Sequence, residues 1–120
     1  MNQELLNLIL ARRSVRRYDA AKPVEESALE TLCRAALAAP SARNQQLREL
    51  VVVTKRETLD TLGAVLPNAP MLKDAGAALV VCGVPARLMP MALLTIGVPL
   101  DGTERAKDKW KPEKIHREKF

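Results

Sequence analysis

Aromatic residues are scarce in this 120-residue sequence, which contains one Tyr, one Trp and one Phe. A hydrophobic core must therefore be built from Leu, Val, Ile and Ala. The scarcity also disfavours a protein that binds single-stranded nucleic acid, because such proteins combine basic grooves with aromatic rings on which bases stack. Only Tyr18 lies near the most basic segment of the chain.

Residues that usually carry metal or hydrolytic chemistry are also few. The two cysteines, Cys33 and Cys82, lie in apolar runs without metal-ligand spacing, so we interpret them as small buried hydrophobes in a reducing compartment. His116 is the only histidine, and we expect it on the surface of a C-terminal helix rather than in a catalytic role. Without a Gly-flanked nucleophilic Ser, a carboxylate pair or a metal motif, nothing in the sequence indicates a hydrolase.

Long apolar runs are missing too. No run approaches the ~20 residues that a membrane-spanning helix needs. The N-terminus does not combine a basic start, an apolar stretch and a cleavage site, so we expect no signal peptide and a cytoplasmic location without membrane contact. The composition, 48% hydrophobic and 28% charged, is that of an ordinary globular protein, and the length predicts a single domain over residues 1–120.

The hydrophobic pattern alternates between helical and strand-like segments. Apolar residues at helical spacing predict helices over 3–12, 26–38 and 55–66. Unbroken aliphatic runs at 50–54, 77–84 and 91–96 predict buried strands that share one sheet. Residues 101–120 are expected to form an extended arm with a short terminal helix. This order predicts an α+β or α/β layer in which helices pack against a small aliphatic sheet, and we expect the α+β class.

Basic residues are concentrated in "ARRSVRRYD", residues 11–19, where four arginines surround Ser14 within a chain of net charge +5. A guanidinium group binds phosphate oxygens in a bidentate manner, and a serine hydroxyl adds a neutral donor. From these residues alone, four interpretations stay open: a solvated turn, a basic patch that binds anions in general, a nucleic-acid surface and a specific phosphate site.

Two further polar segments could contact a ligand. The segment "APSARNQQ", residues 39–46, has one serine and three carboxamides between a predicted helix and a predicted strand. Carboxamides both donate and accept hydrogen bonds, which suits the edge of a heteroaromatic ring such as a flavin, although a plain polar turn fits equally well. In the C-terminal arm, Lys107, Lys109 and Lys111 alternate along the chain and could reach a phosphate or form a solvated tail.

The order of these motifs resembles the nitroreductase family of FMN-dependent NAD(P)H oxidoreductases. The similarity extends over most of the chain, through the segments "RRSVRRYD", "APSARNQQ" running into "LVVVT", "LKDAGAALVVCG", "MALLTIGVP" and "KDKWKPEKIHREKF". It implies a nitroreductase-like layered sheet with flanking helices. It also implies an FMN cofactor, NAD(P)H as reductant and an oxidised small-molecule acceptor such as a nitroaromatic or a quinone.

The resemblance also implies roles for individual residues. The phosphate of FMN would be held by Arg12, Arg13, Ser14 and Arg16, while Arg17 faces solvent. The loop along the flavin and its ribityl chain would contain Pro40, Ser41, Asn44 and Gln46. Asn68 would add another polar contact, and Lys107 and Lys109 would complete the phosphate site. No side chain is expected to act as a catalytic acid or base, because the flavin carries the chemistry.

The chain departs from the family pattern in two places. Leu47 and Arg48 stand where the family usually has a proline followed by an aromatic residue. In addition, "VVCGV" runs almost directly into "PARLMPMALLTIGVP", so a long central segment is absent. A natural short form, a degenerate copy and an engineered deletion all fit this shortening.

The shortening leaves three functions open. The first is an FMN oxidoreductase, and the second is a family remnant that binds flavin weakly without turnover. The third, which we disfavour, is a basic nucleic-acid-binding module. Members of the family bind FMN at a two-fold interface, so we expect a homodimer held by the helices at 3–12 and 26–38 and by exchanged C-terminal arms.

Overall fold

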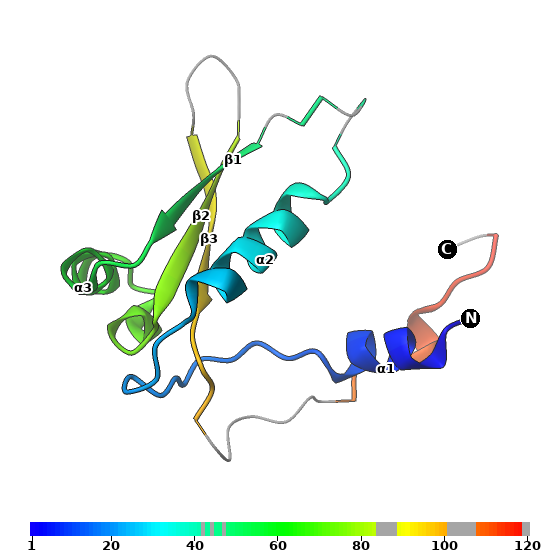
Figure 1. Ribbon diagram of the computed structural model, residues 1–120. Coiled ribbons are helices and arrows are strands. Elements are labelled where there is room, and N and C mark those ends of the chain that lie inside the picture. The colour runs from blue at the N-terminus through cyan, green and yellow to red at the C-terminus, as the bar shows by residue number, and fades with distance from the viewer. Residues whose placement is uncertain (42, 44, 47, 84–88, 101–107, 119–120) are drawn as a thin grey trace. The chain divides into compact units, whose positions relative to one another are not determined.

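The computed structural model describes residues 1–41, 43, 45–46, 48–83, 89–100 and 108–118. The chain divides into two compact units, and each is described by itself. The larger unit covers residues 16–101 and contains the sheet, whereas the smaller unit combines residues 1–15 with 102–120. Figure 1 shows the elements of both units along the chain.

The larger unit is organised around a three-stranded antiparallel sheet in the order β1-β2-β3 (Figure 1). The strands are β1 (Arg48–Val53), β2 (Ala77–Gly83) and β3 (Met89–Ile96). Val80 of β2 lies between Val51 of β1 and Leu93 of β3. The prediction that the three aliphatic runs share one sheet in an α+β fold is therefore confirmed.

The prediction that all three strands are buried was wrong for β1 and β3. Val51 and Val52 are 51% and 42% exposed, and Leu94 of β3 is 49% exposed. Only the central strand β2 is largely buried, with Ala77, Ala78, Leu79 and Cys82 in the core. In the order β1-β2-β3, both β1 and β3 are edge strands. An edge strand has a neighbouring strand on one side only, whereas β2 has one on each side.

Two helices and a short 3-10 turn lie beside the sheet: α2 (Glu26–Leu37), α3 (Arg56–Val65) and η2 (Pro70–Lys73) (Figure 1). The boundaries of both helices agree with the predicted segments to within a residue, whereas η2 was not predicted. Each element inserts one nearly inaccessible leucine into the core, namely Leu29, Leu59 and Leu72.

The guanidinium group of Arg56 connects α3 to the chain that leads into β2. Its Nη1 donates to the carbonyl oxygen of Ala75 over 2.8 Å, and its Nη2 donates to the carbonyl oxygen of Leu72. Its Nε donates to Asp60 Oδ1 one turn further along α3 over 2.9 Å. One charged side chain therefore satisfies two carbonyl groups outside the helix that carries it.

The smaller unit contains α1 (Gln3–Ala11) and, within its described residues, one 3-10 turn, η3 (Pro112–Lys114). Asn2 caps α1, because its Oδ1 accepts from the backbone N–H groups of Glu4 and Leu5 at 3.0 and 3.2 Å. No residue of α1 is buried. The predicted terminal helix is therefore reduced to η3, and His116 is exposed but lies beyond it rather than on a helix.

Two further expectations concern thiols and membranes. Cys33 and Cys82 are both free thiols, and Cys82 is buried as expected, but Cys33 on α2 is only partly buried. Among the described residues, no helix is both long enough and apolar enough to cross a membrane.

Candidate functional site

The arginine-rich segment begins where α1 ends. Arg12 caps the C-terminus of that helix, and its N–H donates to the carbonyl oxygen of Ile9 over 3.3 Å, after which the chain leaves the helical path. Arg12, Arg13 and Ser14 belong to the smaller unit, whereas Arg16 belongs to the larger one. All four residues are exposed, so an anionic ligand can approach their side chains.

Tyr18 holds the end of this segment on the sheet of the larger unit. The residue is 6% exposed, and its hydroxyl lies 2.6 Å from Thr95 Oγ1 on β3. On either side of it, the Asp19 N–H donates to Val98 O, and the Leu100 N–H donates to Arg17 O. Tyr18 is thus a buried anchor rather than a surface for base stacking, and Arg16 and Arg17 directly precede it.

The role of Tyr18 was not predicted from the sequence, but Gly97 was a sequence signal for a close contact at this position. A Cβ atom on Gly97 would lie 2.7 Å from Cδ1 of the Tyr18 ring, which is closer than side-chain carbons approach one another. A glycine at a strand often marks such a close approach. The sequence does not say which ring approaches it.

The loop between α2 and β1 carries the predicted carboxamide segment. Pro40, Ser41 and Gln46 are described there, whereas Asn44 lies outside the described residues. The Gln46 N–H donates to Ser41 Oγ over 3.0 Å, which closes the loop on itself. Gln46 and Arg43 have φ values of 51° and 53°, in the left-handed region that non-glycine residues seldom occupy. The hydrogen bond and these φ values define the path of the described part of the loop.

Arg48, noted in the sequence only as a departure from the family pattern, holds both ends of this loop. It is the first residue of β1, and its Nη1 donates to Pro40 O over 3.1 Å, while its Nη2 donates to Ala39 O. Its own N–H donates to Gln46 O over 2.8 Å. Pro40, Ser41 and Gln46 are thus brought together by hydrogen bonds to or around Arg48.

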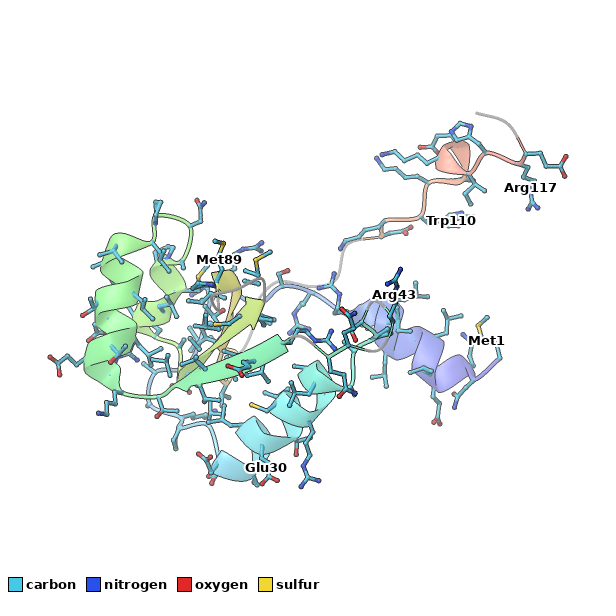
Figure 2. All side chains as sticks on the ribbon, turned by 90° about the horizontal axis from the view of Figure 1, so that it is seen from above. Met1, Glu30, Arg43, Met89, Trp110 and Arg117 are labelled. Carbon is cyan, nitrogen blue, oxygen red and sulfur yellow. The ribbon has the colours of Figure 1, made fainter. Side chains whose placement is uncertain are left out.

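The remaining predicted site residues lie elsewhere. Asn68 is exposed in the turn between α3 and η2. Lys109 is exposed in the C-terminal segment of the smaller unit, and Lys107 lies outside the described residues. Figure 2 shows the side chains of Trp110 and Arg117 on that segment.

The donor set suits an organic anion better than a metal ion. No group of three His, Cys, Asp or Glu side chains that could hold a metal occurs within the part of the chain that the structure describes. The candidate residues instead offer guanidinium groups, serine hydroxyls and carboxamides. Guanidinium groups match phosphate oxygens, and carboxamides match the mixed donors and acceptors of a heteroaromatic ring.

A sequence model of the Nitroreductase family matches residues 9–117, nearly the whole chain. The chain belongs to the nitroreductase family. The matched range includes the arginine segment, the loop of Ser41 and Gln46, and most of the C-terminal segment. The family membership and the nitroreductase-like fold predicted from the motifs are both confirmed.

Individual relatives show how far the likeness extends. A protein of Archaeoglobus fulgidus with the provisional name NADH dehydrogenase/NAD(P)H nitroreductase is 25% identical, with 98% of this chain and 99% of that protein covered. That alignment spans 174 residues, more than this chain possesses, so the relative has residues without a counterpart here. This agrees with the shortening seen in the sequence.

Solved structures of related proteins share the fold. The crystal structure of a protein from Parabacteroides distasonis with the same provisional name has a TM-score of 0.89 at 29% identity, with 100% of each chain covered. An FMN-dependent nitroreductase of Clostridium difficile has a TM-score of 0.80 over 91% of this chain and 96% of that one. Its identity is 20%, so this second likeness concerns the fold alone.

Proposed function

We propose that this nitroreductase-family protein is an FMN-dependent oxidoreductase that transfers hydride from NAD(P)H to an oxidised small molecule, such as a nitroaromatic or a quinone. The observation that carries the proposal is the span of the family match, residues 9–117, which contains both polar segments singled out in the sequence. The provisional name of the Archaeoglobus fulgidus relative mentions NAD(P)H, which supports the choice of reductant.

The proposed phosphate-binding residues are Arg12, Arg13, Ser14 and Arg16. Their exposure lets a ligand approach the donors, and a charge-assisted hydrogen bond to phosphate is about twice as strong as one between neutral groups. Lys107 and Lys109 are proposed to add positive charge from the C-terminal segment. A lysine acts there as a point charge, whereas an arginine also fixes the orientation of the phosphate.

The proposed contacts with the flavin ring and the ribityl chain come from Pro40, Ser41, Asn44, Gln46 and Asn68. Ser41 Oγ accepts from the Gln46 N–H, so the hydroxyl proton can still be donated to a ligand oxygen or nitrogen. The exposed carboxamide of Gln46 both donates and accepts. These groups fit the alternating donors and acceptors of a flavin without requiring a charged side chain.

The chemistry that FMN supplies when bound is hydride transfer between a reduced nicotinamide and an oxidised acceptor. The chain's own residues then need to bind the phosphate, orient the ring and leave one face open. This division of labour agrees with the composition of the candidate site, in which none of the proposed residues is a carboxylate or a histidine.

We propose further that the functional form is a homodimer. Four apolar residues of α1, namely Leu5, Leu8, Ile9 and Leu10, are 56–70% exposed. On α2, Leu32 and Leu37 are 42% and 49% exposed. Exposed apolar surface of this kind favours association, and a two-fold arrangement would give two equivalent sites.

Visible absorbance after reconstitution with FMN, followed by oxidation of NADH and NADPH with a nitroaromatic or a quinone, tests the proposal. We expect flavin bands to remain with the protein after free FMN is removed and reductant to be consumed. Bound flavin without turnover would instead favour a family remnant, which the shortened chain also suggests. Binding to random DNA that falls steeply with salt, without any flavin, would favour a basic nucleic-acid module.

A further inference from the structure

We propose that Arg48 is a positioning residue that fixes the described part of the loop between α2 and β1, residues 39–41, 43 and 45–46. Its link to the flavin rests on the proposed function, because that loop contains Pro40, Ser41 and Gln46. Arg48 itself is not proposed to touch the ligand. Its terminal guanidinium nitrogens donate to backbone carbonyl oxygens.

The geometry shows a single side chain that bridges the two ends of the loop. Ala39 and Pro40 follow Ala38, which caps the C-terminus of α2, and Arg48 opens β1. The two terminal nitrogens of Arg48 donate to the carbonyl oxygens of Ala39 and Pro40, and its backbone N–H donates to Gln46 O. Both the entry and the exit of the loop are therefore bonded to the same residue.

These hydrogen bonds satisfy carbonyl groups just beyond the end of a helix, where the regular helical donors are no longer available. A planar guanidinium fork can serve two neighbouring carbonyl groups at once, whereas an ammonium group cannot hold the same geometry. Arginine is thus the side chain suited to this position.

The Nε atom of Arg48 provides a further observation on the hydrogen bonds of this side chain to Ala39 and Pro40. It is buried and has no hydrogen-bond partner among the described residues. Burying such a donor without a partner is unfavourable, so the two charge-assisted bonds made by the same group must offset that cost. A side chain placed at random on the surface would keep all of its donors in water.

The loop needs such a tether because its backbone is strained. Gln46 and Arg43 both have positive φ values, and each such non-glycine residue costs free energy that the surroundings must supply. The hydrogen bonds of Arg48 to Ala39, Pro40 and Gln46 provide a restraint of this kind.

The test compares Arg48→Met, which keeps a long side chain but loses its donors, with Arg34→Met as a matched control. Arg34 lies on α2 and pairs with the exposed Glu30 carboxylate over 2.8 Å. Glu30 lies on the outer side of α2 (Figure 2). Both variants lose one positive charge, but we expect only Arg48→Met to free the loop.

The first readout is amide hydrogen exchange of Gln46 in the flavin-free protein. We expect exchange about ten-fold faster in Arg48→Met and unchanged in Arg34→Met, with the Leu59 amide of α3 as the monitor of the intact fold. If Arg48→Met does not fold, Arg48→Lys replaces it, and we expect faster Gln46 exchange there too. Exchange equal to that of the wild type in the folded variant would overturn the positioning role.

The second readout is flavin binding. FMN and riboflavin should both bind about ten-fold more weakly to Arg48→Met, because the loop is proposed to contact the ring and not the phosphate. The visible circular dichroism of the bound flavin should also fall, since a loosened loop orients the ring less strictly. Unchanged affinity and dichroism, with faster Gln46 exchange, would overturn the link to the flavin.

Failure of the wild type to bind either flavin would have a different meaning. It would overturn the proposed function and the ligand part of this inference together. The exchange of the Gln46 amide would still decide whether Arg48 fixes the loop, because that measurement needs no ligand.

Discussion

Tyr18 and Gly97 connect the arginine segment to the end of β3 through one close contact. The Tyr18 ring covers the position that a side chain on Gly97 would occupy, and the Tyr18 hydroxyl is hydrogen bonded to Thr95. Packing of this kind tolerates little added volume, because protein interiors are packed as densely as organic crystals. Arg16 and Arg17 directly precede this anchor in the sequence.

Gly97→Ala is expected to destabilise the protein by about 1–3 kcal/mol, because the new methyl group would displace the Tyr18 ring. Urea unfolding measures the change. Gly63→Ala is the control: its Cβ would lie 3.3 Å from Leu72 Cβ, and inside α3 alanine also gains helix propensity. We expect the control to change stability by less than about 1 kcal/mol. Equal stability of the two variants would contradict the close contact.

The proposed phosphate role of the arginines is tested one residue at a time. Arg12→Ala or Arg16→Ala should weaken FMN binding about ten- to a hundred-fold, because a charge-assisted hydrogen bond contributes roughly 1.5–3 kcal/mol. Riboflavin, which has no phosphate, should bind almost unchanged. Titration of the flavin fluorescence measures both affinities.

Arg17→Ala serves as the control for this comparison. Its side chain is exposed, and its backbone carbonyl, which the substitution keeps, accepts from Leu100. We expect FMN to bind to it as to the wild type, apart from a small loss of general positive charge. Equal losses for FMN and riboflavin in Arg12→Ala would instead mean that the residue acts through the fold.

At the scale of elements, α3 packs against η2. Leu59 is 1% exposed and Leu72 is 0% exposed, and Arg56 links α3 to the carbonyl groups of Leu72 and Ala75. In contrast, α1 has no buried residue. The apolar residues of these helices look similar in the sequence, but they contribute differently to the stability of a single chain.

Leu72→Ala should therefore cost about 2–5 kcal/mol, since it removes a buried side chain and leaves a cavity. Leu10→Ala on α1, where the leucine is 66% exposed, should change the stability of the monomer by less than about 0.5 kcal/mol. Thermal or urea unfolding at low protein concentration checks both. A large loss for Leu10→Ala under these conditions would contradict the exposure of α1.

The strand order of the sheet predicts which backbone amides are protected from hydrogen exchange. The strand β2 is paired on both sides, so its N–H groups have partners, whereas an edge strand points about half of them away from the sheet. We expect native-state amide exchange to be slowest in β2, with Val80 among its protected amides. Rapid exchange of Val80 would refute the central position of β2.

At the scale of the whole molecule, the exposed apolar residues of α1 and α2 are the basis of the proposed dimer. Light scattering at micromolar concentration is expected to give a dimer for the wild type. Leu8→Glu should shift it towards the monomer, because a charge would be buried in the interface. Val65→Glu is the matched control, since Val65 is 65% exposed on α3, outside the proposed interface.

The comparison of Leu8→Glu with Val65→Glu distinguishes a dimer interface through α1 from association that does not depend on α1. Monomers in Leu8→Glu and dimers in Val65→Glu support an interface through α1. A wild-type protein that binds flavin as a strict monomer would contradict the proposal. Aggregation without flavin would favour a degenerate member of the family.

The sequence alone determined the three α-helices and the three strands, because helical and strand-like periodicities arise from which residues can share one face. It also determined the family, since the order of short polar motifs around "LVVVT" and "LVVCG" is specific. These properties depend on residues that are near one another along the chain.

Tertiary structure alone decided which apolar residues are buried and which polar residues hold the loop. Val51 and Leu79 lie in aliphatic runs that look alike in the sequence, but Val51 is half exposed on an edge strand, whereas Leu79 is buried in the central one. Likewise, Arg48 bonds to Ala39 and Pro40, and Tyr18 reaches Thr95. Burial and long-range hydrogen bonds depend on which neighbours the fold supplies, and a local pattern does not contain that information.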